Sequence, residues 1–427
     1  MSQFVIHGGK PLNGIVRVGG SKNAALPILA ATLLTDQKCV LKNIPNIEDV
    51  RNMLEILRSL GSKVEFRNHT VEIQTQKIRQ GRVPKELGCR MRASILLLGP
   101  LLAKTGFAHL PYPGGCVLGA RPIDTHIDVL SKLGITKMAS RSDEIIFKGK
   151  SRCAEVILPE FSVTATENAI MAAARTCGET VIRLAALEPH VQDLCNFLEE
   201  LGVDIRGIGT HNLRIRGKKN LHGARYAVAP DYLEAGSLII ASVLTRGNVL
   251  VKNVVHRDLD ALWNLFKEMK VNFAFEKNAV RIRPTKKWYG CKRLQTNVFP
   301  GFSTDLQPPF TILLTQAEGQ SYIHEALFEN RFAYFSDLIK MGANLKKINQ
   351  HEAVVKGPAK LHGAQVKSWD IRAGAAMILA ALTAKGKTVI KDIRYIDRGY
   401  EGFDEKLRKL GAEIERLTTD NLQPIIG

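Results

Sequence analysis

The chain contains one pattern six times, and this internal repeat constrains its fold more than any other feature. Each copy has a Leu or Met, usually a following Gly, and then two short alternating runs around a polar turn, as in LGSKVEFRNHTVEIQ from Leu60. Such alternation of apolar and polar residues predicts paired strands. The glycine position recurs at spacings of 73, 68, 68, 72 and 69 residues, which indicates six units. It is occupied in turn by Gly61, Gly134, Gly202, Lys270, Gly342 and Gly411.

An amphipathic helix is predicted before each of these strand pairs. Residues 48–61, EDVRNMLEILRSLG, place Val50, Met53, Leu54 and Leu57 on one face at helical spacing. The glycine that follows can adopt the left-handed conformation that ends many helices. In the fourth unit a lysine stands at this position, so we expect a different cap there.

A second set of helices is apolar on nearly all sides. The sequences NAALPILAATLL, LEAGSLIIASVLTRG and IRAGAAMILAALTAKG are examples, and each is followed by a short strand. Helices of this kind are normally buried, and these are too short to span a membrane. Each unit is therefore predicted as helix, strand, loop, helix and hairpin. Six units predict an α/β protein of two lobes with three repeats each, the apolar helices inside and the sheets outside.

The boundary between the lobes is expected in HGARYAVAPD, residues 222–231, between the third and fourth units. A strand is predicted over residues 4–19, before the first buried helix. If this strand joins the second lobe, the chain crosses between the lobes twice. A cleft between two lobes is a common place for a small-molecule site.

Charge narrows the possible functions. The chain has 60 Lys and Arg against 41 Asp and Glu, a formal net charge of +19, but the basic residues are dispersed and aromatic residues make up only 6%. Nucleic-acid-binding proteins usually concentrate basic residues in a patch, often beside aromatic side chains. We therefore expect an ordinary basic surface or an enzyme with anionic small substrates, and no nucleic-acid binding.

The location and the cofactor requirement are inferred from what the sequence lacks. It has no apolar stretch of about 20 residues and no signal-peptide core near its first residue, and its seven cysteines are scattered without a CxxC pair. These features predict a cytoplasmic protein without a disulfide framework or a metal site. No cofactor and no membrane contact are expected.

Cations occur at the starts of the apolar helices, where the helix dipole disfavours them. Ser21 can cap the first of these helices, with Lys22 and Asn23 in its first turn, although Pro27 favours a helix that begins after Asn23. An anionic ligand bound where the helices begin would explain the cations together. The alternative for Lys22 is a solvated side chain after a Gly–Gly turn. The other cations at such positions are Arg90, Arg92 and, beside Asp370, Arg372.

Three more positions are candidates for chemistry, each with an alternative. Thr304 and Asp305 begin the fifth apolar helix, where both are good N-caps, but Asp305 could also act as a general base. Cys116 lies in a Gly- and Pro-rich loop and is either a buried structural cysteine or a thiol activated by Arg121. Arg398 lies in another loop, before the last amphipathic helix.

These motifs resemble those of the UDP-N-acetylglucosamine 1-carboxyvinyltransferase family. The similarity runs in register from about residue 4 to residue 417 and includes GGSKNAALPILAATLL, RMRASILLLGPLLA, GGCVLGARPIDTH, PDYLEAG, FSTDLQ, FENRF and YIDRGYE. The related 5-enolpyruvylshikimate-3-phosphate synthases share the six-unit architecture but lack the GGC loop. The resemblance implies a two-domain inside-out α/β barrel, with a first lobe at residues 22–229 and a second at residues 1–21 and 230–427.

The resemblance also implies a reaction. The enolpyruvyl group of phosphoenolpyruvate would be transferred to the 3′-hydroxyl of UDP-N-acetylglucosamine by addition and elimination, with release of phosphate, in the first committed step of peptidoglycan synthesis. Cys116 would help to protonate C3 and would be the residue that fosfomycin alkylates. Asp305 would position or deprotonate the sugar hydroxyl, Asp370 would assist proton removal in the elimination, and Lys22 would also take part in catalysis.

Two sets of binding residues follow from the resemblance, in a monomer whose lobes close over both substrates and exclude water. Phosphoenolpyruvate would be bound by Lys22, Asn23, Arg92, Arg121, Arg372 and Arg398. The UDP-sugar would be bound by Asn23, Arg92, Arg121, Pro122, Ile123, Asp124, Thr125, Ser162, Val163, Thr304, Asp305 and Leu327.

The chain departs from the family's usual residues on the nucleotide side. Glu160 stands near the Ser-Val pair where the family usually has a lysine, and a carboxylate there would repel a diphosphate. Thr164 replaces a glycine, Thr125 replaces an aliphatic residue, and Tyr232 stands where arginine is common. These differences favour an alternative function, that of a paralogue acting on a different nucleotide-linked acceptor.

Overall fold

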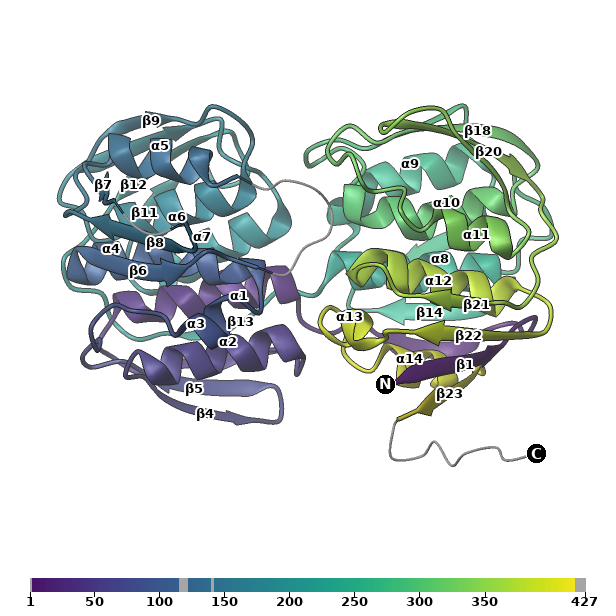
Figure 1. The fold of residues 1–427 in the computed structure, drawn as a ribbon, viewed down its shortest axis with the longest axis horizontal. Coiled ribbons are helices and arrows are strands. Elements are labelled where there is room, and N and C mark those ends of the chain that lie inside the picture. The colour runs from purple at the N-terminus through teal and green to yellow at the C-terminus, as the bar shows by residue number, and fades with distance from the viewer. Residues whose placement is uncertain (1, 115–121, 140–141, 419–427) are drawn as a thin grey trace. The chain divides into compact units, whose positions relative to one another are not determined.

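The chain forms two compact units in the computed structural model, which describes residues 2–114, 122–139 and 142–418 (Figure 1). The C-unit contains residues 2–19 and 230–418, and the N-unit contains the described residues between 20 and 229. Each unit has its own apolar core. Within the described ranges, no helix has both the length and the apolar character needed to cross a bilayer.

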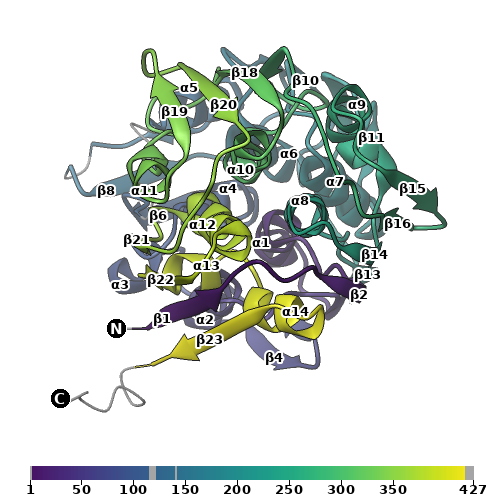
Figure 2. The ribbon, with the colours of Figure 1, turned by 90° about the vertical axis from the view of Figure 1, so that its right-hand side faces the viewer.

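The C-unit consists of three central helices with three four-stranded sheets around them, as Figure 2 shows. The central helices are α8 (Tyr232–Leu244), α10 (Gln307–Thr315) and α12 (Ile371–Thr383). The shorter helices are α9 (Asp260–Glu268), α11 (Phe335–Lys340), α13 (Arg394–Asp397) and α14 (Phe403–Lys409). In the order in which they pair, the strands are β15 (Phe273–Glu276), β16 (Ala279–Ile282), β14 (Asn248–Lys252) and β2 (Asn13–Arg17); β17 (Arg293–Gln295), β18 (Gly319–His324), β20 (Glu352–Gly357) and β19 (Asn344–Lys347); and β21 (Gln365–Lys367), β22 (Lys387–Lys391), β1 (Gln3–His7) and β23 (Glu413–Leu417).

The N-unit repeats this plan, with two four-stranded sheets and one three-stranded sheet among its described residues. Its buried helices are α1 (Lys22–Ala31), α4 (Leu98–Thr105) and α6 (Val163–Ala173), and its amphipathic helices are α2 (Glu48–Ser59), α5 (Asp124–Lys132) and α7 (Pro189–Glu200); a short α3 (Lys85–Gly88) lies between α2 and α4. The strands are β13 (Arg225–Ala227), β3 (Cys39–Lys42), β5 (Thr70–Gln74) and β4 (Lys63–Arg67); β6 (Phe107–Pro111), β8 (Glu144–Lys148) and β7 (Thr136–Lys137); and β11 (Asp204–Arg206), β12 (Asn212–Arg216), β10 (Glu179–Arg183) and β9 (Glu155–Ile157). The predicted α/β class, with apolar helices inside the sheets, is confirmed.

The N-terminal segment differs from the single strand predicted over residues 4–19. It forms two strands, β1 and β2, which belong to different sheets of the C-unit. Gly8 lies between them, and a Cβ atom there would come within 2.2 Å of the Ala381 carbonyl oxygen. The chain can therefore pass close to α12 and turn from one sheet into the next only because this residue lacks a side chain.

The six repeat positions share one backbone conformation. Gly61, Gly134, Gly202, Gly342 and Gly411 have φ values between 81° and 106°. The expectation of a different cap in the fourth unit is wrong, because Lys270 also has a positive φ, of 61°. The next amide, that of Val271, donates to Phe266 O at 2.9 Å, just as Ser62 N donates to Leu57 O at 3.0 Å in the first unit. The repeat imposes the turn on a residue that disfavours it.

Replacing Lys270 by glycine should stabilise the protein. A left-handed lysine is strained by about 1 kcal/mol, and glycine removes this strain at some cost in the entropy of the unfolded chain. We expect a net gain of roughly 0.5 kcal/mol, seen as a higher melting temperature. The Gly411→Lys variant is the matched control: a Cβ atom there meets nothing closer than 3.9 Å, so strain alone should lower its melting temperature. If both substitutions shifted the melting temperature in the same direction, this explanation would be contradicted.

Candidate active site

Two side chains just before α10 in the C-unit, those of Thr304 and Asp305, were candidates for capping this helix. The prediction that Thr304 and Asp305 cap this helix is wrong. The cap of the preceding 3-10 helix η4 (Thr304–Leu306) is Ser303, whose hydroxyl accepts from Asp305 N at 3.3 Å. Thr304 and Asp305 are thereby free to bond to other parts of the C-unit.

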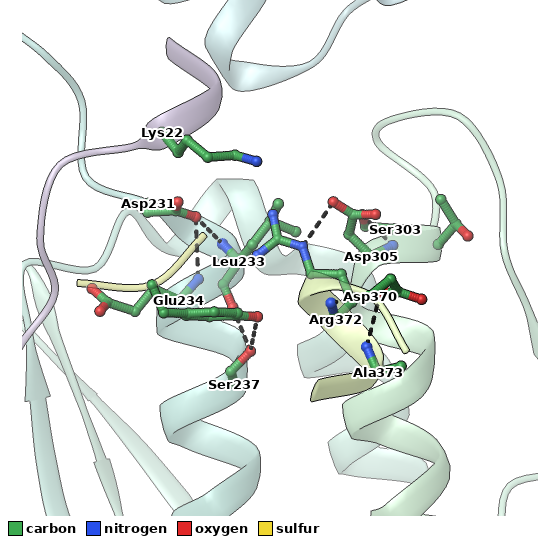
Figure 3. A network of polar contacts seen from close by, with 12 residues as sticks. Lys22, Asp231, Leu233, Glu234, Ser237, Ser303, Asp305, Asp370, Arg372 and Ala373 are labelled. Carbon is green, nitrogen blue, oxygen red and sulfur yellow. Dashed lines mark hydrogen bonds and ion pairs between the residues drawn. The ribbon is translucent and has the colours of Figure 1, made fainter. Parts of the chain in front are cut away.

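Asp305 is bonded to two buried arginines. Its Oδ2 accepts from Arg372 Nε at 3.0 Å, the contact drawn in Figure 3, and its Oδ1 accepts from Arg331 Nη2 at 2.5 Å. The side chains of Arg331 and Arg372 are 0% and 4% exposed. One carboxylate therefore partly compensates two buried guanidinium groups.

Arg331 was missed as a functional residue, although it lies in the FENRF motif. Besides Asp305, its Nε donates to Thr304 Oγ1 at 3.1 Å. Thr304 in turn donates to Glu325 Oε1 at 2.9 Å, and the Leu327 amide donates to the same oxygen at 3.1 Å. The signal in the sequence was the FENRF motif itself, in which the polar residues Glu329, Asn330 and Arg331 stand between two phenylalanines.

Asp370 caps α12, the helix on which Arg372 lies. Its Oδ1 accepts from the amides of Arg372 and Ala373 at 2.7 and 3.0 Å (Figure 3), and Arg331 Nη1 lies 4.0 Å from the same oxygen. The capping carboxylate satisfies amides at the positive end of the helix dipole. This arrangement allows a buried arginine in the first turn of a helix.

The electrostatics of this group follow from burial and pairing. Burial alone would raise the pKa of Asp305, but Arg372 and Arg331 hold the pKa well below its ordinary value. Burial would lower the pKa of Arg372, whereas Tyr400, Asp305 and Asp231 raise it. Asp305 is therefore an ionised acceptor, and it becomes a stronger base only when another anion takes over its arginines.

Two donors in this group lack acceptors. Nη1 of Arg331 and Nη1 of Arg372 are buried and have no hydrogen-bond acceptor among the residues that the structure describes. Buried charged donors normally find partners, so the missing acceptors indicate an anionic ligand or ordered water. Of the other predicted residues of the C-unit, Leu327 contacts Glu325 through its amide while the residue is 40% exposed, and Arg398 follows directly after α13.

Lys22 is the first residue of α1 in the N-unit. Ser21 caps the helix and accepts from Ala24 N, so the helix begins before Asn23 and includes Pro27, contrary to the later start that Pro27 suggested. Proline is tolerated here because the only hydrogen bond it removes is one to the carbonyl of Asn23, in the first turn. The Lys22 side chain is 11% exposed and lies 3.6 Å from Asp49 Oδ2, so the solvated alternative is wrong.

Arg92 begins the 3-10 helix η2 (Arg92–Leu97), which continues into α4. The predicted second apolar helix thus has a 3-10 first part. Arg92 Nη2 donates to Pro122 O at 3.3 Å, which connects η2 to the segment before α5. Burial, with a contribution from Arg92, lowers the pKa of His126 to about 3. His126 is therefore neutral, and its Nε2 lies 3.1 Å from Thr164 Oγ1.

The segment before α6 contains the unusual carboxylate. Glu160 Oε1 accepts from Thr125 Oγ1, in the first turn of α5, at 2.6 Å. Ser162 occupies the cap position of α6 without a side-chain capping bond, and the first turn has no acidic residue. The amides of Thr164 and Ala165, which a cap at Ser162 would bind, consequently receive no capping bond from it, and such a helix start can accept an anion.

Not every predicted residue can be placed. Ile123 comes directly before α5, Asp124 is its first residue, and Pro122 is the acceptor of Arg92. Cys116 and Arg121 lie outside the described residues. The structure thus places one group of predicted residues in the C-unit and another in the N-unit, and the roles given to them remain predictions.

Glu167 of α6 supports a separate prediction about stability. It is 2% exposed, its Oε1 has no hydrogen-bond partner within the described ranges, and burial, aided by Glu188, raises its pKa well above the ordinary value. In the unfolded chain Glu167 loses its proton near pH 4.5, whereas in the folded protein it keeps the proton to a higher pH. Between these two pKa values folding requires uptake of a proton, so the free energy of unfolding falls as the pH rises. The Glu167→Gln variant should therefore be more stable than the native protein at pH 7 and nearly equal to it near pH 4.5. Thermal unfolding across this range measures the gain, and a pH-independent effect would refute it.

Comparisons with known proteins match this chain over nearly its whole length. The family model described as EPSP synthase (3-phosphoshikimate 1-carboxyvinyltransferase) matches residues 6–425. A UDP-N-acetylglucosamine 1-carboxyvinyltransferase from Treponema denticola is 40% identical over 423 residues, covering 97% of this chain and 99% of the relative. The enzyme of the same name from Kosmotoga olearia is 44% identical over 418 residues, with coverage of 97% and 99%.

Two solved structures are similar to this chain over nearly its whole length. The enolpyruvyl transferase NikO from Streptomyces tendae superposes with a TM-score of 0.87 at 26% identity, covering 97% of this chain and 99% of that chain. An EPSP synthase from Acinetobacter baumannii has a TM-score of 0.77 at 18% identity, covering 98% and 100%, and this likeness concerns the fold alone.

Proposed function

The chain belongs to the UDP-N-acetylglucosamine 1-carboxyvinyltransferase family, within the wider EPSP synthase family, and from this we propose that it transfers the enolpyruvyl group of phosphoenolpyruvate to UDP-N-acetylglucosamine. The acceptor is the 3′-hydroxyl of the sugar, and phosphate is released. The product serves peptidoglycan synthesis.

The observation that carries this proposal is the carboxylate held between two buried arginines that keep unsatisfied donors. Phosphoenolpyruvate carries a carboxylate and a phosphate, and guanidinium groups bind both through paired hydrogen bonds. Asp305 Oδ2 is bonded to Arg372 Nε at 3.0 Å, so an anion that binds Arg372 also changes the basicity of Asp305. This coupling suits a base that acts on the acceptor hydroxyl only when the other substrate is present.

The reaction then divides between the proposed residues. Cys116 helps to protonate C3 of phosphoenolpyruvate, the acceptor oxygen adds to C2, and Asp305 positions or takes the hydroxyl proton. Phosphate leaves from the tetrahedral intermediate, and loss of the C3 proton, assisted by Asp370, forms the enol ether. The negative charge on phosphoenolpyruvate and on the leaving phosphate needs a cationic site, and exclusion of water protects the reactive C2, at which positive charge develops. Lys22 and the arginines predicted from the sequence provide these cations.

The test is direct. The protein is incubated with both substrates, and phosphate release is measured together with the mass of the UDP-sugar. The proposal expects one phosphate released per enolpyruvyl-sugar formed, and inactivation by fosfomycin with a covalent adduct at Cys116. Absence of phosphate release, or release with an unchanged UDP-sugar, would refute it. Adduct formation on a Cys116→Ala variant would refute the assignment of the thiol.

A second candidate function is favoured by the contact between Glu160 and Thr125. The carboxylate reaches the first turn of α5 and belongs to the residue two positions before Ser162, the cap position of α6, where an anion is expected. It opposes a diphosphate and favours an acceptor that offers a hydroxyl or amide donor at this position. The second candidate is therefore the same transfer to another nucleotide-linked acceptor.

Acceptor preference separates the two candidates. A panel of UDP-sugars and simpler nucleotides is compared by kcat/KM for the native protein and for Glu160→Lys and Glu160→Gln. If UDP-N-acetylglucosamine is the true acceptor, no other compound should exceed its kcat/KM. If another acceptor is preferred and Glu160→Lys shifts the preference back toward UDP-N-acetylglucosamine, the second candidate holds.

The proposal also includes the setting of the enzyme. We expect a cytoplasmic monomer that requires neither a metal nor a cofactor, with the two lobes predicted from the sequence acting on the same pair of substrates. Mass determination in solution and activity in the presence of a chelator test these expectations.

A further inference from the structure

Tyr400 contacts Arg372, one of the two buried arginines bonded to Asp305, and has no role in the reaction proposed above. It is 2% exposed, and the guanidinium carbon of Arg372 lies 5.2 Å from the centre of its ring. Its hydroxyl lies 3.1 Å from Ser237 Oγ on α8. The same tyrosine therefore contacts the arginine on α12 and a serine on α8.

The turn that carries Tyr400 is packed closely against the start of α12. Arg398, Gly399 and Tyr400 follow α13, and Tyr400 N donates to Ile396 O at 2.9 Å. A Cβ atom on Gly399 would lie 2.2 Å from Cγ2 of Ile371, the neighbour of Arg372. Only glycine allows this approach, which fixes the turn against the segment that presents Arg372.

We infer that Tyr400 is a positioning residue for phosphoenolpyruvate, acting through Arg372 and, along the backbone, through Arg398. The ring supports one face of the Arg372 guanidinium by a cation–π contact, so that Nε stays directed at Asp305. The hydroxyl, held by Ser237, fixes the ring, and with it the turn two residues after Arg398. This inference rests on the proposed function, since it assigns Arg372 and Arg398 to the same anionic substrate.

The effect should be specific to one substrate. Arg372 binds a carboxylate or phosphate through paired hydrogen bonds, which require a fixed orientation of the guanidinium group. If this orientation is no longer fixed, these hydrogen bonds become weaker. The contacts of Tyr400 described above do not involve the residues predicted to bind the nucleotide in the N-unit. We therefore expect weaker binding of phosphoenolpyruvate with little change in the binding of the acceptor.

The experiment uses two variants that remove the same contact from its two ends. Tyr400→Phe keeps the ring and removes the hydroxyl, and Ser237→Ala removes its partner on α8. Each should raise KM for phosphoenolpyruvate roughly fivefold, the loss of one hydrogen bond, and should leave KM for the acceptor within about twofold. The double variant should add little to either single variant, because both remove one interaction.

The chain contains a matched control on the same helix. Ser242 is buried on α8 and bonds back to Leu238 O at 2.7 Å, as Ser237 bonds to Leu233 O at 2.8 Å, but only Ser237 contacts Tyr400. Ser242→Ala should therefore leave both KM values unchanged. If Ser237→Ala behaves like Ser242→Ala, or if both substrates are affected equally, Tyr400 has a structural role only and the inference is overturned.

Calorimetric binding of phosphoenolpyruvate separates this inference from the proposed function. Turnover by the native protein with unchanged KM in the variants would overturn the inference alone. Failure of the native protein to turn over would overturn the proposed function, and the binding constants of the native protein and Tyr400→Phe would then decide the inference. Absence of phosphoenolpyruvate binding to the native protein would overturn both.

Discussion

The Asp305→Asn variant should lose about 10³-fold in kcat while still binding phosphoenolpyruvate. Asparagine cannot accept the hydroxyl proton, so the acceptor oxygen remains a poor nucleophile. Arg331 and Arg372 lose their shared carboxylate, and two buried cations without an anion should bind the anionic substrate at least as tightly as before. Stopped assays give kcat, and calorimetry gives the dissociation constant of phosphoenolpyruvate.

The same substitution should change the pH dependence of stability. Because the pKa of Asp305 is lowered in the folded protein, its contribution is present above the ordinary pKa of 3.8 and is lost as the pH falls toward the folded-state pKa. The melting temperature of Asp305→Asn should therefore lie below that of the native protein at neutral pH, and the difference should shrink under acid. Asp404→Asn is the matched control. Asp404 lies in the same unit, and two arginines lower its pKa against the opposing effect of burial, as they do for Asp305. It should lose stability but keep kcat; if both variants lose kcat equally, Asp305 has no special part in catalysis.

The repeat made the architecture predictable because its signal is periodic. Six copies of one helix and hairpin pattern specify which helices are buried, and the structure confirms the α/β class that follows from them. Lys270 shows where such reasoning fails: residue preference favoured a different cap, but packing in the fourth unit imposes a φ of 61°. Local preferences amount to about 1 kcal/mol, and tertiary structure can override them.

The active-site group was predictable only in part. Three consecutive residues, Ser303, Thr304 and Asp305, can all cap a helix, and sequence spacing does not show which one does. The choice depends on Arg331, which follows Asp305 by 26 residues and meets it only in the folded unit. Pairings over such separations leave no periodic signal, so the sequence singled out Asp305 and Arg372 by their positions at helix starts without pairing them, and the structure added Arg331.

Replacing Arg331 by lysine should lower kcat/KM for phosphoenolpyruvate by about 10²- to 10³-fold, although the charge is kept. Arg331 uses Nε for Thr304 and Nη2 for Asp305, and the Thr304 hydroxyl is in turn bonded to Glu325. A single ammonium group cannot reach these partners in the same planar arrangement. Thr304 then loses a donor, Asp305 turns toward Arg372 alone, and the unsatisfied Nη1 donor disappears.

The Arg416→Lys variant tests whether loss of any arginine fork would have the same result. Arg416 donates from Nη1 and Nη2 to Asp397 at 2.9 and 2.8 Å and also contacts Asp404, so its pairing resembles that of Arg331. Arg416→Lys should lower the melting temperature and leave kcat/KM nearly unchanged, whereas Arg331→Lys should lower both. If Arg331→Lys lowers only the melting temperature, Arg331 supports the fold without serving the reaction. Support of the fold alone would affect kcat/KM for both substrates alike. If Arg331→Lys lowers kcat/KM for phosphoenolpyruvate only, the Arg331 side chain and its unsatisfied Nη1 act on the anionic substrate.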